Sequence, residues 1–462
     1  TVNGIGVAGL GIVTIRNNKI GSITTTGSTT TIATGIIGIQ SSSEGIVTID
    51  SNTIGSITTL NSLQASNAST GNTTQIVTGV NNTGTATAMI ITNNLIANLH
   101  NAYVPNTANT NRIMAGIVST GGINTITGNT VRNLGTAANA TGSGAAASVI
   151  GISLSVATEG ITTVSQNTVY ALTNTNVTAA SSVTGIYYAG PTTLENTVAG
   201  NNIYNLALGT TSSAASVRGI HFNSGLTAIK NNFVRLGYDT AGASLIYGIP
   251  ITGIYESAGA SGSGIYFNSV YIGGTGVGAE TGNTFAFRSD QVTANRTFEN
   301  NVFVNARSNT SAGGKHYAVR VAGTTVNPAG LTLNYNDYFV SGNGGVFGFY
   351  NSLDVSDLAS WQAFVGKDVN SISGDPVFIN ESGATPNLHI NPAIASPVES
   401  AGIFIASITD DIDGQDRSLL TPTDIGADAG DFILSDISVP VMSYAALGTT
   451  CNTDNRTLSV NI

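Results

Sequence analysis

The feature that most constrains the fold is a motif, apolar-x-x-Asn-x-apolar, that recurs ten times between residues 15 and 338. Successive copies lie 31 to 42 residues apart, with a mean near 35. A repeat of this length is typical of a solenoid, in which each unit buries its apolar face only by stacking on its neighbours. The motif asparagines are Asn18, Asn52, Asn94, Asn129, Asn167, Asn201, Asn232, Asn268, Asn301 and Asn336.

The residues around each asparagine predict strands rather than helices. An apolar residue lies three positions before every motif asparagine and another lies two positions after it. Most of these residues are β-branched, as in residues 12–15 and 46–49, and glycine and threonine are too frequent for helical repeats. We therefore predict an all-β fold, a right-handed parallel β-helix in which inward Ile and Val side chains stack on their equivalents, about 4.8 Å away.

A second recurring feature is a glycine followed by an apolar residue, 13 to 20 positions before the asparagine of its repeat. The distance from each asparagine to the next such glycine is more variable, 16 to 27 residues, and includes the inserts 62–75 and 136–148. We expect two constrained strand regions per coil and one variable side. The pairs are Gly35-Ile36, Gly79-Val80, Gly116-Ile117, Gly151-Ile152, Gly185-Ile186, Gly219-Ile220 and Gly248-Ile249.

The recurrent asparagine has a structural interpretation. A side-chain amide in a turn can bond to the equivalent amide of the next coil, at about 1 kcal/mol per bond. Asparagine also tolerates the left-handed backbone that such turns need. We expect the ten asparagines to form a ladder that fixes the stacking, and we assign them no ligand role.

Composition excludes several classes of protein. Only 9% of residues are charged, but no apolar run approaches the roughly 18 residues of a membrane span. The net charge of −10 arises from 15 basic and 25 acidic residues, which argues against nucleic-acid binding. The single cysteine, Cys451, permits no intrachain disulfide, and no signal peptide is visible. We interpret the chain as a mature product or a fragment.

The pattern changes after the coils, and we predict three regions. Residues 1–340 form the coils, residues 341–432 close the β-helix, and residues 433–462 begin an immunoglobulin-like sandwich. Several short motifs follow one another in the closing part: NDYF at 336–339, SGDPVF at 373–378, NLHI at 387–390, NPAI at 391–394, DIDGQDR at 411–417 and DIGAD at 424–428.

This succession resembles the closing part of large cell-surface β-helix proteins of Bacteroidota-type bacteria, over about residues 330–432. That family often has an acidic residue after DIGAD, where this chain has Ala429. The resemblance implies an extracellular, cell-surface location, export by the type IX secretion system, and a role in adhesion or gliding motility. It also implies that the chain belongs to a larger parent with further domains.

Catalytic chemistry has little support in the sequence. Glycosidases on a β-helix need carboxylates clustered on neighbouring coils, but the 13 acids of residues 1–370 are scattered. Only Asp354 and Asp357 lie within three residues of each other. Glu44 and Glu159 share a repeat position but lie three coils apart, or roughly 14 Å. We predict a protein that is not an enzyme and has no cofactor.

Two weaker candidate sites remain. Tyr187 and His221 occupy equivalent positions on adjacent coils and could stack a sugar ring, or they are ordinary surface residues. Asp410, Asp411, Asp413 and Asp416 fall within seven residues and could bind Ca²⁺, although the twelve-residue calcium loop is missing. An Asp-rich capping turn is the competing interpretation.

The function predicted from the sequence is mechanical and adhesive. The chain would be a rigid stalk or would offer a lateral surface to glycans or other surfaces. One alternative is a polysaccharide lyase or hydrolase. Another is a self-assembling filament, since an apparently uncapped first coil leaves strand edges that invite stacking.

Overall fold

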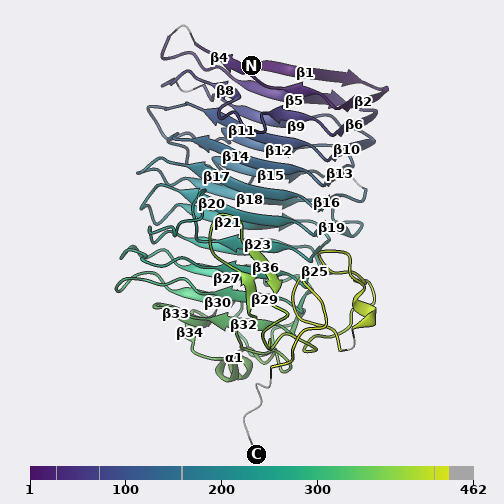
Figure 1. The fold of residues 1–462 in the computed structure, drawn as a ribbon, viewed down its shortest axis with the longest axis vertical. Coiled ribbons are helices and arrows are strands. Elements are labelled where there is room, and N and C mark those ends of the chain that lie inside the picture. Colours follow the sequence, from purple (N-terminus) through teal and green to yellow (C-terminus); the bar gives the residue numbers. More distant parts are fainter. Residues whose placement is uncertain (28, 72, 158–159, 421, 436–462) are drawn as a thin grey trace, which may run out of the picture.

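The chain folds into a right-handed parallel β-helix of about 10 turns, as the sequence predicted (Figure 1). The computed structural model describes residues 1–435 except residues 28, 72, 158–159 and 421. Three parallel sheets run the length of the coil stack, and each coil contributes a strand to sheet A, then to sheet B, then to sheet C. The predicted immunoglobulin-like module lies almost entirely outside the described residues.

The strands of the three sheets follow one another at the spacing of the repeat. Sheet A consists of β1 (Val2–Gly9), β5 (Ile36–Ser43), β9 (Val77–Asn82), β12 (Met114–Ser119), β15 (Val149–Ser155), β18 (Ser182–Ala189), β21 (Ser216–Ser224), β24 (Ile251–Glu256), β27 (Thr284–Ser289), β30 (His316–Val321), β33 (Gly345–Tyr350) and the antiparallel β34 (Leu353–Val355). Sheet B consists of β2 (Ile12–Arg16), β6 (Ile46–Asp50), β10 (Ala88–Thr92), β13 (Asn124–Thr127), β16 (Thr163–Ser165), β19 (Asn196–Ala199), β22 (Thr227–Lys230), β25 (Ser263–Tyr266), β28 (Arg296–Glu299) and β31 (Leu331–Asn334). Sheet C consists of β3 (Lys19–Ile20), β7 (Thr53–Gly55), β11 (Leu95–Asn101), β14 (Thr130–Thr136), β17 (Thr168–Asn174), β20 (Asn202–Leu208), β23 (Phe233–Leu236), β26 (Ser269–Ile272), β29 (Val302–Asn305) and β32 (Asp337–Val340), extended by β4 (Ile23–Thr25) and β8 (Leu63–Ala65).

The connections between sheets differ in how much their length varies. Two residues, such as 17 and 18, separate each strand of sheet B from the next strand of sheet C. The connections from sheet C to the next strand of sheet A are longer and more variable, for example residues 137–148 in one coil and 175–181 in another. The predicted variable side is therefore the C-to-A side. All the apolar residues that flank the motif asparagines are buried, as predicted.

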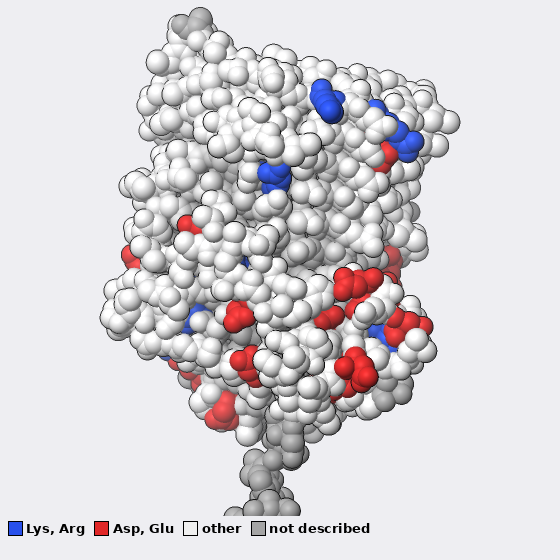
Figure 2. Space-filling view, viewed as in Figure 1, with Lys and Arg blue, Asp and Glu red and all other residues white. Residues whose placement is uncertain are grey.

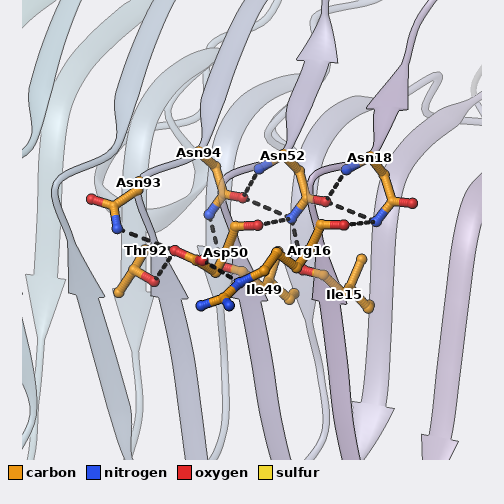
Figure 3. A network of polar contacts seen from close by, with 9 residues as sticks. All are labelled: Ile15, Arg16, Asn18, Ile49, Asp50, Asn52, Thr92, Asn93 and Asn94. Carbon is orange, nitrogen blue, oxygen red and sulfur yellow. Dashed lines mark hydrogen bonds and ion pairs between the residues drawn. The ribbon is translucent and has the colours of Figure 1, made fainter.

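The asparagine ladder runs through the B-to-C turns (Figure 3). Each asparagine's Nδ2 donates to the Oδ1 of the next one at 2.8 to 3.0 Å. That same Oδ1 also accepts the preceding asparagine's backbone N–H at 2.9 to 3.1 Å. From Asn52 onward, each Nδ2 donates as well to a backbone carbonyl of the previous coil, such as Ile15 O for Asn52. The predicted ladder is confirmed.

The expectation that the ladder asparagine adopts a left-handed backbone is wrong. The residue before it takes the positive φ in every turn, and none of the ladder asparagines does. The ladder residue must aim its amide along the stack, so the tight reversal falls on its neighbour. These neighbours are Asn17, Ser51, Asn93, Gly128, Gln166, Gly200, Asn231, Phe267, Asn300 and Tyr335.

Two of the seven predicted glycine pairs are out of register. Ile39, not Ile36, pairs with Val80, and Ile254, not Ile249, pairs with Ile220. The equivalent glycine of these coils faces the apolar residue that follows the asparagine, and there is no space there for a side chain. A Cβ on Gly38 would lie 2.4 Å from Ile54 Cγ2. A Cβ on Gly35 would have its nearest contact at 3.0 Å, on Thr1. The sequence repeat alone could not separate Gly35 from Gly38, which are three residues apart.

The predicted closing part, residues 341–432, has two pieces. Helix α1 (Leu358–Val365) closes the end of the coil stack, with Trp361 and Val365 buried in the main core. Residues 373–435, here called the closing segment, turn back and pack on the outside of sheet C (Figure 1). Their strands, β35 (Phe378–Asn380) and β36 (Asn387–Ile390), form an antiparallel pair beside β23.

Candidate functional site

The outer face of sheet A changes its chemistry along the stack. Parallel register places one outward residue of each coil in a single column, here called the central column. Its first five members are small, polar or aliphatic: Gly6, Gln40, Asn81, Val118 and Ser153. From β18 onward the members are aromatic or basic: Tyr187, His221, Tyr255, Arg288, Arg320 and Phe349.

A second column beside it also carries basic or aromatic side chains on β21, β27 and β30. They are Arg218, Phe285 and Tyr317. Guanidinium groups and rings alternate across the two columns. Arg288 lies over the rings of Tyr255 and Phe285 at 4.9 and 5.7 Å from their centroids. Arg320 lies over Phe285 and Phe349 at 5.7 and 5.6 Å. Cation–π contacts of this kind orient the guanidinium groups while leaving N–H donors available.

One acid holds this group together. Asp290 accepts from Arg288, at 2.6 Å for Nη2, and from the Tyr255 hydroxyl at 2.8 Å, and it pairs with Arg320 at 3.2 Å. Burial acts to raise the pKa of Asp290, but these donors hold it below its usual value. The Arg288, Arg320 and Asp290 side chains are 30%, 26% and 23% exposed, so they are accessible to solvent.

The face carries a surplus of positive charge. Three arginines, at 218, 288 and 320, lie beside the single carboxylate of Asp290. The Nη1 of Arg218 is buried without a hydrogen-bond acceptor in the structure, and Arg218 lies 5.2 Å from the Tyr255 ring centroid. In a chain of net charge −10, this is a local concentration of positive charge.

A hollow of about 430 Å³ adjoins the C-terminal end of the same face. Lys315, Tyr317, Phe349 and Asp354 are among its lining residues. Lys315 forms an ion pair with Asp354, which also accepts from the Tyr317 hydroxyl at 2.8 Å. Burial and the Asp354 carboxylate raise the pKa of Tyr317. The hollow thus offers an aromatic wall and an ion pair.

The predicted platform residues meet but do not form an open surface. Tyr187 and His221 make an edge-to-face contact with ring centroids 5.1 Å apart. They are only 7% and 6% exposed, because the short 3-10 helix Gly144–Ala146 lies over them. Burial, with Arg218 and Arg288, lowers the pKa of His221 to about 3. The accessible part of the column lies further along, at Arg288 and Arg320.

The four aspartates predicted to bind calcium have different contacts. Asp411 accepts the backbone N–H groups of Asp413 and Gln415, and Asp416 caps a short 3-10 helix, Arg417–Leu419. Asp410 is exposed. Only Asp413 belongs to a group of three potential metal ligands, with His389 and Asp428, and it is the one such group among the described residues. Calcium binding stays a prediction.

The acids considered for catalysis have structural contacts. Asp354 is paired as described above, and Asp357 caps α1 by accepting the Ser360 N–H at 2.8 Å. Glu159 lies outside the described residues, so its spacing from Glu44 is untested.

Sequence analysis missed the arginines of sheet A. A signal existed: each central-column member from Gly6 to Tyr255 lies two residues after a glycine of the same strand, as in Gly219-Ile220-His221 and Gly253-Ile254-Tyr255. In the later coils alanine replaces that glycine, at Ala286 and Ala318. The glycine pattern therefore ended before it reached Arg288 and Arg320.

Comparisons with protein-family models and with curated proteins give no match to this chain. Within the residues that the structure describes, no helix has the length and apolar character needed to cross a membrane.

Proposed function

We propose that this chain is a non-catalytic, rigid segment of a bacterial cell-surface protein that binds acidic glycans along the outer face of sheet A. The observation that carries the proposal is the run of aromatic and arginine side chains on successive coils, from Tyr255 to Phe349. The cell-surface location is part of the proposal and is supported by the resemblance that the motifs of the closing part carry.

The chemistry of the column suits an acidic polysaccharide. Arginine binds carboxylate and sulfate groups through paired N–H donors, and aromatic rings pack against the apolar faces of sugars. Coils follow one another at about 4.8 Å, so a chain-like ligand lying along the column meets a new side chain at each coil. Because the column continues over successive coils, it favours a polymer over a small compact molecule.

A rigid rod is supported by the continuity of the ladder and the core. Nine amide contacts join the ten ladder asparagines, and one apolar core extends from Ile15 to Val365. The filament alternative needs strand edges at both ends of the stack. Helix α1 covers one end, which counts against the filament alternative.

The enzyme alternative has one location worth testing, the hollow beside Tyr317. A lyase needs a general base with a pKa near the working pH. The pKa of Tyr317 is instead raised, and Lys315 is engaged with Asp354. This arrangement favours binding over proton abstraction.

The test is to incubate the purified chain with polygalacturonate, alginate, heparin, dextran and cellulose, and to measure both retention and new reducing or unsaturated ends. The proposal predicts retention on the acidic polymers without new ends. Product that accumulates at catalytic amounts of protein would establish an enzyme, and equal retention on neutral and acidic polymers would remove the role of the arginines.

A further inference from the structure

The closing segment brings together three potential metal ligands that are far apart in the sequence. His389 lies on β36, Asp413 in the turn at 410–416, and Asp428 in the DIGAD motif. One ligand atom from each lies within 4.8 Å of the other two. Donor atoms bound at about 2.1 Å to one ion lie at most about 4.2 Å apart, so a small inward movement gives a coordination geometry.

The imidazole of His389 is held in a metal-binding orientation. Its Nδ1 meets the side-chain carbonyl Oδ1 of Asn387, an acceptor, so Nδ1 carries the proton. The ring packs edge-to-face on Phe233, with centroids 4.9 Å apart. This directs Nε2 at Asp413 Oδ2, 2.8 Å away. A hydrogen bond from Nδ1 to a carbonyl is the usual outer contact of a metal-bound histidine.

The contact between His389 Nε2 and Asp413 Oδ2 requires a positive charge, either a cation between the two atoms or a further proton on one of the two groups. With Nδ1 protonated, a neutral imidazole presents a lone pair at Nε2 to a carboxylate oxygen, and two acceptors repel at 2.8 Å. Either a second proton on the ring or a cation resolves this contact. The same atoms therefore hold a proton or a metal ion.

The surroundings of this group carry more negative charge than the contact between His389 and Asp413 alone. Asp428 is only 6% exposed, and its Oδ2 accepts the Ile390 N–H at 2.7 Å. The nearby Arg417 donates to the backbone carbonyls of Gly426 and Ala427 rather than to these carboxylates. Acidic side chains gather over this part of the molecule, whereas the upper coils of the same face carry few charges (Figure 2).

We propose that His389, Asp413 and Asp428 bind a divalent first-row transition-metal ion, Zn²⁺ in the first instance, that fastens β36 to the DIGAD motif. One imidazole and two carboxylates match Zn²⁺ or Mn²⁺, whereas Ca²⁺ takes six to eight oxygens. Asp413 is 53% exposed and His389 is 31% exposed. Asp413 also borders a hollow of ≈ 370 Å³ between the closing segment and sheet B, which gives an entry path.

The experiment titrates ZnCl₂, MnCl₂ and CaCl₂ into chelator-treated full chain by calorimetry and follows the thermal unfolding midpoint of each mixture. A Cys451→Ser background removes the single thiol as another zinc ligand. The expected result is one Zn²⁺ per chain, a raised midpoint, and weaker binding of Ca²⁺. An ion that binds only the folded state raises stability in proportion to its affinity and concentration.

His389→Gln and Asp413→Asn are the test variants, because both side chains are partly exposed and the substituted amides keep a similar size. Each is expected to weaken Zn²⁺ binding at least ten-fold and to abolish the shift in midpoint. Asp410→Asn, in the same turn but outside the group, is the matched control and should bind as the parent does. Absence of Zn²⁺ binding by the parent, tighter binding of Ca²⁺, or equal binding by all variants would overturn the site.

Discussion

Ser371 ends the asparagine ladder by accepting the backbone N–H of Asn336 on its Oγ at 2.9 Å. The hydroxyl thus occupies the place of an eleventh amide. Ser371 in turn donates to Asp368, which also accepts the indole N–H of Trp361 at 2.7 Å. The polar ladder and the apolar cap of the β-helix are therefore joined at one buried carboxylate.

The ladder makes a prediction about stability. Asn167→Ala removes the acceptor of the buried Asn129 backbone N–H at 3.0 Å and one of the acceptors of Asn129 Nδ2, also at 3.0 Å, while Nδ2 keeps Ile91 O. A buried donor without a partner costs about 1–3 kcal/mol, so we expect a loss of roughly 2–3 kcal/mol in unfolding free energy, measured by urea denaturation. Asn106→Ala, at an exposed position, is the control. A similar small loss in both variants would show that the ladder adds little.

The glycines of sheet A give a second prediction. A Cβ at Gly185 would lie 2.6 Å from Ile203 Cγ2 and 2.7 Å from Gly219 O. Gly185→Ala should therefore cost about 1–3 kcal/mol through overpacking. A Cβ at Gly6 meets nothing within 4 Å, so Gly6→Ala should leave the thermal unfolding midpoint unchanged or slightly raised. Equal midpoints for the two variants would contradict the register assigned to the glycine column.

The raised pKa of Asp368 predicts that the stability of the fold depends on pH. Burial raises its pKa from 3.8 to about 6, despite the hydrogen bonds that oppose this shift. The folded state then holds a proton that the unfolded state has released, so this group's contribution to stability is full below about pH 4 and falls as pH rises to about 6. Two pKa units correspond to about 3 kcal/mol.

The asparagine of Asp368→Asn has no proton to lose, so the stability of this variant does not fall through this group as the pH rises from about 4 to about 6. The variant should be much less stable than the parent at pH 4, where it loses a well-bonded acid, and the difference should shrink by up to about 3 kcal/mol at pH 7. Chemical denaturation at several pH values measures this difference. A gap that is constant or that widens with pH would show that Asp368 is ionised in the folded state throughout.

The sequence determined the repeat but not every register within it. The asparagine motif was readable because each copy bonds to the same atoms of its neighbours, as at Asn52 and Asn94. The glycine pattern was ambiguous at residues 35–39, since only contact with Ile54 distinguishes Gly38 from Gly35. The closing segment was less predictable because its position depends on single long-range contacts. One example is Arg235, which donates to Glu381 O and Gly383 O from β23.

The surroundings of the candidate sites were not predictable from the sequence for the same reason, their dependence on long-range contacts. Tyr187 and His221 were found by repeat position, but the loop over them is a variable insert whose path has no periodic signal. The group of His389, Asp413 and Asp428 joins residues up to 39 positions apart in a region without repeats. Only the packing of the closing segment brings them together.

Whether the arginines of sheet A bind acidic glycans is tested most directly by the dissociation constant for a defined acidic oligosaccharide. The double variant Arg288→Gln, Arg320→Gln should weaken binding at least ten-fold, and added salt should weaken binding by the parent. Asn81→Ala, in the same column on an earlier coil, should bind as the parent does. Unchanged affinity in the double variant, or an equal loss in the control, would contradict the claim.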